Sequence, residues 1–201
     1  MKTLFITPYI TTQAHPAFFT PNYQTGLGYM VYDIANYVGR SENVDLFALI
    51  VMTESFNVGN MHVIGHNYFS ILKHFRLRSL LAAYRYLKKY PSCSLTHLIR
   101  IFGKFLIISQ IEKIVKDYDI VHIHGVSEVL NYIIDICQEQ NVKFLVTLHG
   151  LISFEEAVKV SNGLKKTEKD FLVRAAKENI PVSFISTGIK ETAESYIEKA
   201  K

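Results

Sequence analysis

The chain has 201 residues, of which 49% are apolar and 20% are charged, and this balance excludes a disordered chain and suits one α/β domain with a single core. Its first apolar run ends at Pro8, which is too short for a secretory signal, and no stretch approaches the roughly 18 apolar residues of a membrane span. The two cysteines, Cys93 and Cys137, have no metal-binding or redox spacing, so we expect a cytoplasmic protein in which Cys137 belongs to the core.

The first half of the chain combines short apolar strands with amphipathic helices. A loop rich in proline and aromatic residues separates the first strand from the first helix, and Pro91 ends a later helical stripe. Strand composition and apolar spacing of three and four residues define the expected elements. The expected strands are 2–7, 44–52 and 61–64, and the expected helices are 26–38, 69–87 and 95–116.

The second half alternates strand and helix regularly. The expected strands are 119–123, 142–148 and 181–185, and the expected helices are 126–138, 154–177 with a break near Asn162-Gly163, and 188–199. Repeated strand–helix units predict a parallel sheet with helices on both faces, which is a Rossmann-like α/β fold. No linker interrupts residues 1–201, so we expect one domain.

Two histidines are candidate site residues because each ends a strand and precedes a glycine. His124 and His149 should reach a common crevice, since ligands of such sheets bind beyond the carboxyl ends of the strands. A histidine there can donate to a sugar hydroxyl or a phosphate oxygen. His122 shares a face with Ile120 and is expected to be a buried, hydrogen-bonded histidine. A zinc site is disfavoured, because no nearby carboxylate or cysteine completes it.

Two further segments reach the same edge of the predicted sheet. Gly26-Leu27-Gly28 opens a helix and lets backbone N–H groups approach a phosphate, although an ordinary loop-to-helix turn would look the same. Val31 stands where a dinucleotide fingerprint needs its third glycine, which disfavours a nicotinamide-dependent oxidoreductase. Ser186 follows the last strand, and capping of the final helix is the alternative to ligand contact.

Four segments occur in the order found in a known class of enzymes. They are the glycine loop at 26–28, the strand at 43–49, the element Asp-Ile-Val-His-Ile-His-Gly at 119–125 and the element Val-Thr-Leu-His-Gly at 146–150. With them the whole chain resembles the N-terminal domain of GT-B glycosyltransferases, particularly the family-4 group of retaining enzymes. The resemblance implies the acceptor-side, Rossmann-like half of a two-domain transferase.

The resemblance also implies a reaction and its residues. A hexose-type sugar would pass from a nucleotide-sugar donor to a glycan or lipid-linked acceptor, without a metal or a cofactor. His149 would be the catalytic residue near the transferred sugar, and Gly26 and Gly28 would lie near the donor diphosphate. His124 and Ser186 are placed near the acceptor or the sugar.

The family's donor-binding elements have no counterpart in this sequence. The donor-binding domain would therefore lie beyond residue 201, and these residues alone are expected to be inactive. The alternative is a stand-alone Rossmann-like binding or interaction domain without catalysis.

Charge is distributed unevenly along the chain. No Asp or Glu occurs from Ser55 to Ile111, a segment that contains Lys73, Arg76, Arg78, Arg85, Lys88, Lys89, Arg100 and Lys104. We hypothesise that the basic region 73–104 contacts anionic lipid at the inner face of a membrane or holds an anionic acceptor. A solvated basic face over a packed helix pair is the alternative. Nucleic acid is not an expected partner, because no binding motif accompanies the charge.

Overall fold

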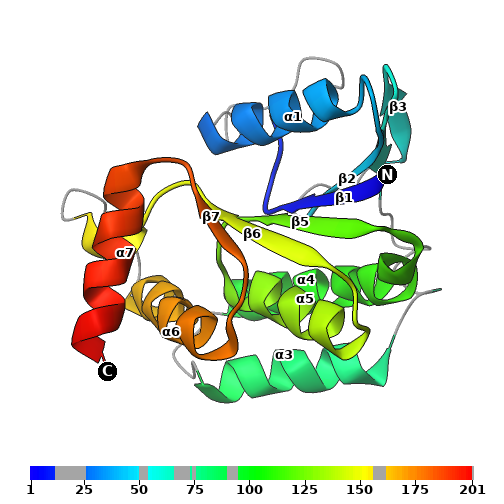
Figure 1. Ribbon diagram of the computed structural model, residues 1–201. Helices are drawn as coiled ribbons and strands as arrows, with labels where there is room; N and C mark the ends of the chain where they lie inside the picture. The colour runs from blue at the N-terminus through cyan, green and yellow to red at the C-terminus, as the bar shows by residue number, and fades with distance from the viewer. Residues whose placement is uncertain are drawn as a thin grey trace.

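The computed structural model describes residues 1–11, 26–49, 54–65, 73, 76–89, 95–155 and 162–200. These residues form a seven-stranded sheet with helices on both faces (Figure 1). In space the strands follow the order β3-β4-β2-β1-β5-β6-β7, and only the β3–β4 pair is antiparallel. The strands are β1 (Lys2–Thr7), β2 (Asn43–Ala48), β3 (Phe56–Val58), β4 (Met61–Ile64), β5 (Ile120–His124), β6 (Phe144–Leu148) and β7 (Val182–Phe184).

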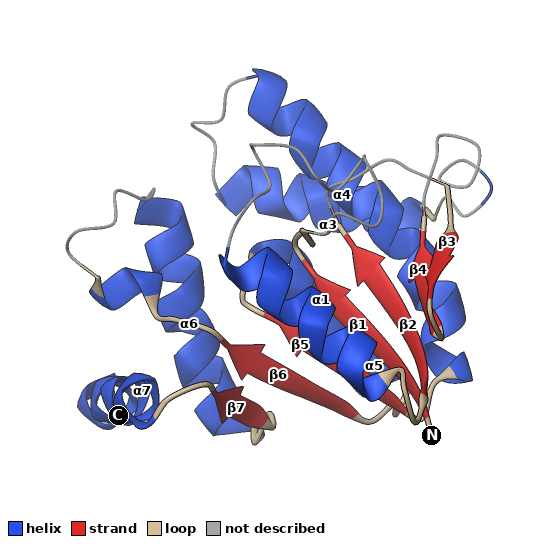
Figure 2. Ribbon diagram, turned by 90° about the horizontal axis from the view of Figure 1, so that it is seen from above, coloured by secondary structure: helices blue, strands red, loops and turns tan. Residues whose placement is uncertain are grey.

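The helices form two layers of unequal size. One face of the sheet carries α1 (Gly26–Val38), and the opposite face carries α3 (Leu77–Lys89), α4 (Leu95–Ile114), α5 (Glu128–Glu139) and α6 (Asn162–Glu178). The last helix, α7 (Thr187–Ala200), lies at the β7 edge beside α6 (Figure 2). Two short 3₁₀ segments, Val115–Asp117 and Ile152–Phe154, follow α4 and β6. Within the described residues, no helix is long and apolar enough to cross a bilayer.

The predicted Rossmann-like fold class is confirmed, and most element boundaries agree within two residues. Three elements differ from the expectation. β3 was not predicted, because its three residues are too few to show alternation; a turn with Gly59 at φ +57° folds it back on β4. The helix expected from residue 154 begins at Asn162, after the 3₁₀ turn. The helix expected over 69–87 begins as α3 only at Leu77, after the non-helical Arg76. The predicted ends at 50–52 and 69–72, and Pro91, lie outside the described residues.

Alternation along β1 divides the core between the two faces of the sheet. Leu4 and Ile6 pack in the larger cluster under α4, α5 and α6, whereas Phe5 packs with Val31 and Ala35 of α1. Cys137 is fully buried in the larger cluster, as predicted, and burial raises the pKa of its thiol to about 12. The core therefore holds β1 rigidly from both sides.

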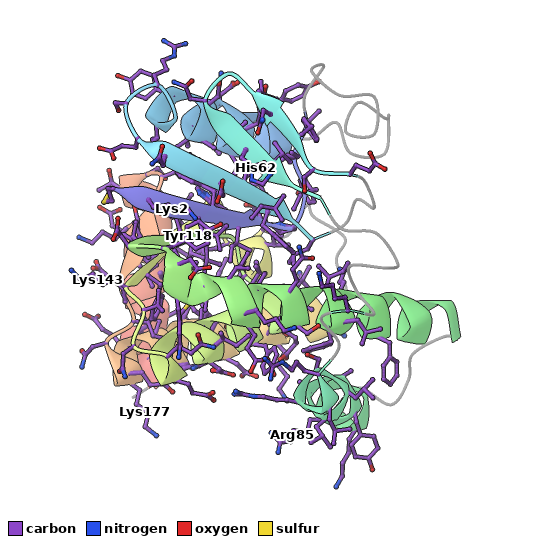
Figure 3. The ribbon with its side chains drawn as sticks, turned by 90° about the vertical axis from the view of Figure 1, so that its right-hand side faces the viewer. Lys2, His62, Arg85, Tyr118, Lys143 and Lys177 are labelled. Atoms are coloured by element: carbon purple, nitrogen blue, oxygen red, sulfur yellow. The ribbon has the colours of Figure 1, made fainter. Side chains whose placement is uncertain are left out.

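A polar network joins the amino-terminal parts of three neighbouring strands. Asp45 on β2 accepts a hydrogen bond from the Tyr118 hydroxyl, and His62 Nδ1 on β4 lies 3.1 Å from its carboxylate. Lys2 Nζ lies 3.7 Å from Asp45 and 4.4 Å from the centre of the Tyr118 ring (Figure 3). Burial and the Asp45 carboxylate raise the pKa of Tyr118. This network fixes the alignment of β1, β2 and β4 away from the carboxyl edge.

Candidate functional site

The carboxyl edge of β1 and β5 is the topological switch point of the sheet. The chain runs outward from β1 to β2 and β4, and then crosses back to β5 on the other side of β1. Ligands of open α/β sheets bind in the crevice at such a point. Residues 8–11 follow β1 there, His124 ends β5, and His149 follows β6.

His124 and His149 form a hydrogen-bonded pair at this edge. His124 Nδ1 lies 2.8 Å from His149 Nε2, and the two rings stack with their centroids 5.1 Å apart. The expectation from sequence that the two side chains come together agrees with this geometry. His124 is fully buried and His149 is partly exposed, so His149 is the member that faces the surroundings.

The relative burial of His122 and His124 is the reverse of the expected one. His122 makes the expected hydrogen bond, with its Nε2 2.7 Å from Thr147 Oγ1, but it stays partly exposed. The His124 ring is enclosed because it lies against two further rings besides His149. Its centroid is 5.4 Å from that of Phe5 and 4.1 Å from that of His122. Strand alternation placed both histidines on one face, but it did not show which ring the neighbours would cover.

Each member of the histidine pair keeps one ring nitrogen without a partner. His124 Nε2 and His149 Nδ1 are buried and make no hydrogen bond within the described part of the chain. A neutral imidazole has one N–H and one acceptor nitrogen. If His124 Nδ1 donates to His149 Nε2, then His149 Nδ1 carries a proton and needs an acceptor; in the other tautomer this nitrogen accepts. A buried polar atom without a partner costs about 1–3 kcal/mol, which a ligand or a water would recover.

All three histidines are held neutral near pH 7. Burial, with a contribution from His149, lowers the pKa of His122 to about 4. Burial lowers the pKa of His124 to about 2, and His122 and His149 add to the shift. Burial also lowers the pKa of His149. The site therefore offers neutral hydrogen-bonding groups rather than positive charge to an incoming ligand.

In the glycine loop at 26–28, Gly28 packs closely against the backbone and side chain of Thr11. Gly26 begins α1, and Gly28 lies against the segment after β1: a Cβ added to Gly28 would stand 2.4 Å from Thr11 Oγ1 and 3.0 Å from Thr11 N. This close approach brings the first turn of α1 beside the end of β1. The packing accounts for a glycine at position 28 whether or not a phosphate binds there.

Replacing Gly28 by alanine should lower the free energy of unfolding by about 1–3 kcal/mol, because the new methyl group overlaps Thr11. Urea titration monitored by circular dichroism measures the change. Gly103→Ala in α4 is the matched control, since its Cβ would meet nothing within 4 Å and alanine favours a helix by about 1 kcal/mol. Equal stability of Gly28→Ala and the unmodified chain would contradict the close approach.

Ser186 has a local structural role. Its Oγ accepts a hydrogen bond from Ile189 N at 3.3 Å, which caps the exposed start of α7, so the capping interpretation from sequence agrees with the structure. Ser186 follows β7, which is separated from β5 by β6, and no described contact joins it to the histidine pair.

Two residues of the site were not predicted. Thr147 pairs with His122 through its hydroxyl, and Glu168 on α6 holds the turn that follows His149. The Glu168 carboxylate accepts hydrogen bonds from Ile152 N at 3.2 Å and Ser153 N at 2.7 Å. The only signal in the sequence is a carboxylate within the apolar stripe of a helix, and such a residue does not reveal its partner.

The described residues contain no group of three or more His, Cys, Asp or Glu side chains arranged to hold a metal ion. His124 and His149 direct facing nitrogens at each other at hydrogen-bond distance rather than toward a common third point.

The sheet order and the helix layers define a Rossmann-like α/β fold of the type that forms one half of a GT-B structure. No family model matches the chain, and no curated protein matches it either. A solved structure with a similar fold is a UDP-forming α,α-trehalose-phosphate synthase from Burkholderia xenovorans, with a TM-score of 0.51 and 12% identical residues. The match covers all of this chain and 43% of that protein, and at this identity it shows the fold alone.

Proposed function

We propose that the chain is the N-terminal, acceptor-side domain of a glycosyltransferase that moves a hexose-type sugar from a nucleotide-sugar donor to a glycan or lipid-linked acceptor. The observation that carries the proposal is the His124–His149 pair at the switch point, with an unpaired nitrogen on each ring. Neutral imidazoles at a crevice suit sugar hydroxyls and phosphate oxygens, which both form hydrogen bonds.

His149 is the catalytic residue in this proposal, and His124 sets its tautomer. When His124 Nδ1 donates to His149 Nε2, the free Nδ1–H of His149 can donate to the transferred sugar or to a donor phosphate oxygen. In the transfer step, the bond from the sugar C1 to the diphosphate oxygen breaks and a bond from C1 to the acceptor oxygen forms. The acceptor's proton ends on the leaving diphosphate, whose growing charge a hydrogen-bond donor stabilises.

The glycine loop would lie near the diphosphate of the donor. The contact between Gly28 and Thr11 supports this placement, because it brings the N-terminal turn of α1 to the end of β1. Backbone N–H groups at a helix N-terminus favour an anion. Gly26 and Gly28 keep this turn free of side chains that would separate backbone from phosphate.

A second domain, which binds the nucleotide, belongs to the proposal. The similar fold of the trehalose-phosphate synthase supports it, since the present chain corresponds to 43% of that protein. Residues 1–201 by themselves are then expected to bind donor weakly and to transfer no sugar.

The test is release of nucleoside diphosphate by the complete gene product that contains these residues, with UDP-, GDP- and ADP-hexoses as donors. We expect release with at least one donor and a fall in kcat of about 100-fold for His149→Ala, the size seen when one transition-state donor is removed. His62→Ala is the matched control, because His62 lies in the polar network around Asp45. It should keep the activity.

Two results would overturn the proposal. One is a folded, complete gene product that releases nucleotide from none of the donors, which favours a binding domain without catalysis. The other is full activity in His149→Ala with unchanged far-ultraviolet circular dichroism.

A further inference from the structure

The outer surface of α3 carries an exposed apolar stripe. Leu77, Leu81 and Tyr84 are 69%, 50% and 63% exposed, and their spacing of four and three residues puts them on one face of the helix. The opposite face is buried, since Ser79 and Ala83 are 0% exposed and α3 packs along α4. Figure 1 shows α3 as the outermost element of its layer. Large apolar side chains are thus presented outward together.

Basic side chains accompany this stripe. Lys88 follows Tyr84 by four residues and continues the same face, while Arg85 and Arg76 flank it, and all three are exposed. Arg85 lies on the outer side of the molecule in Figure 3. Because residues 55–111 contain no carboxylate, α3 and its neighbours in sequence carry no acidic side chain to offset this charge.

Two carboxylates of the adjacent helix α5 are paired with arginines. Glu139 of α5 accepts hydrogen bonds from Arg78, and Asp135 of α5 is paired with Arg174 of α6. Arg78 also lies 3.6 Å from Glu112. Arg78 is therefore paired with carboxylates of the fold. The positive charge that faces outward comes from Arg76, Arg85 and Lys88.

We propose that α3 is a peripheral membrane-binding surface that lies on an anionic bilayer, with Leu77, Leu81 and Tyr84 at the headgroup–acyl boundary and Arg76, Arg85 and Lys88 among the headgroups. An amphipathic helix with large apolar residues and flanking cations is the arrangement that binds at this boundary. The contact does not depend on the proposed sugar transfer.

The size of the stripe favours a bilayer over a protein partner. A helix of 13 residues is about 20 Å long, and three apolar side chains on it fall far short of the roughly 800 Å² per partner that a stable protein interface buries. A bilayer needs no complementary shape, and the exposed cations Arg76, Arg85 and Lys88 suit anionic lipid.

The experiment is flotation of the 201-residue chain with vesicles of phosphatidylcholine alone and with vesicles that also contain about 30 mol% phosphatidylglycerol. We expect binding to the anionic vesicles at about 0.05 M salt, loss of binding at about 0.5 M, and little binding to phosphatidylcholine. Arg85→Glu/Lys88→Glu should lower the partition coefficient at least about tenfold, and Leu81→Ser/Tyr84→Ser should lower it by a similar factor. All four side chains are exposed, so the variants should remain folded.

Lys143→Glu/Lys177→Glu is the matched control, because it changes the net charge equally at exposed positions before β6 and on α6, and Figure 3 shows both lysines apart from Arg85. It should bind as the unmodified chain does, apart from a small general charge effect. No binding to anionic vesicles at low salt, or equal losses in the α3 and control variants, would overturn the proposal. So would a dimer in sedimentation equilibrium that Leu81→Ser/Tyr84→Ser abolishes without any vesicle binding.

Discussion

The free energy of unfolding is expected to fall steeply as the pH drops from 7 to 5, because the fully buried His124 and the partly buried His122 take up protons only when the chain unfolds. The folded-state pKa is about 4 for His122 and about 2 for His124, whereas an unfolded histidine titrates near 6.5. Below pH 6.5 the unfolded state binds more protons, so stability present at pH 7 is lost on acidification. Below about pH 6.5, each of these two histidines lowers the free energy of unfolding by about 1.4 kcal/mol per pH unit, which amounts to about 2 kcal/mol at pH 5.

Urea titrations at pH 7, 6, 5.5 and 5 measure this slope. His124→Gln should lower the slope by about 1.4 kcal/mol per pH unit, whatever it does to stability at pH 7. His62→Gln removes a histidine next to Asp45 and should leave the contribution of the buried cluster in place. A free energy of unfolding that stays constant from pH 7 to 5 would mean that the His124 ring is hydrated, contrary to its 0% exposure.

The fold could be predicted because apolar spacing is a strong local signal in long elements. Residues 26–38 and 61–64 form the expected helix and strand without adjustment. β3 could not be predicted, because a three-residue edge strand depends on its partner β4 and on the turn at Gly59. Residue pairing of this kind arises from tertiary structure and leaves little trace in composition.

The site could be predicted only as far as the ends of the strands. The positions of His124 and His149 after β-type segments placed them at one edge, and the structure brings them to hydrogen-bond distance. The burial of His124 against Phe5 and the ion pair between Arg78 and Glu139 depend on side chains that are distant in sequence. Local patterns contain no information about such partners.

Glu168→Ala should destabilise the chain by about 3 kcal/mol, which makes this buried carboxylate the most important support of the turn after His149. Glu168 is 8% exposed and accepts two backbone hydrogen bonds, from Ile152 and Ser153. Hydrogen bonds to a charged group each contribute about 1.5–3 kcal/mol, and alanine would leave two amides without an acceptor. Part of the cost is recovered if water enters the gap.

The same substitution tests whether the turn positions His149. Glu168→Gln keeps one carbonyl oxygen as an acceptor, so it should lower the free energy of unfolding by about half as much as Glu168→Ala. The control is Glu194→Ala on the exposed side of α7, whose free energy of unfolding should stay within about 0.5 kcal/mol of that of the unmodified chain. Ser153 Oγ also donates to Lys165 O at 2.7 Å, so the turn stays partly tethered to α6 in both variants. The amides of Ile152 and Ser153 should exchange with solvent much faster in Glu168→Ala, as hydrogen exchange would measure. Unchanged protection at both amides would show that Glu168 does not hold this turn.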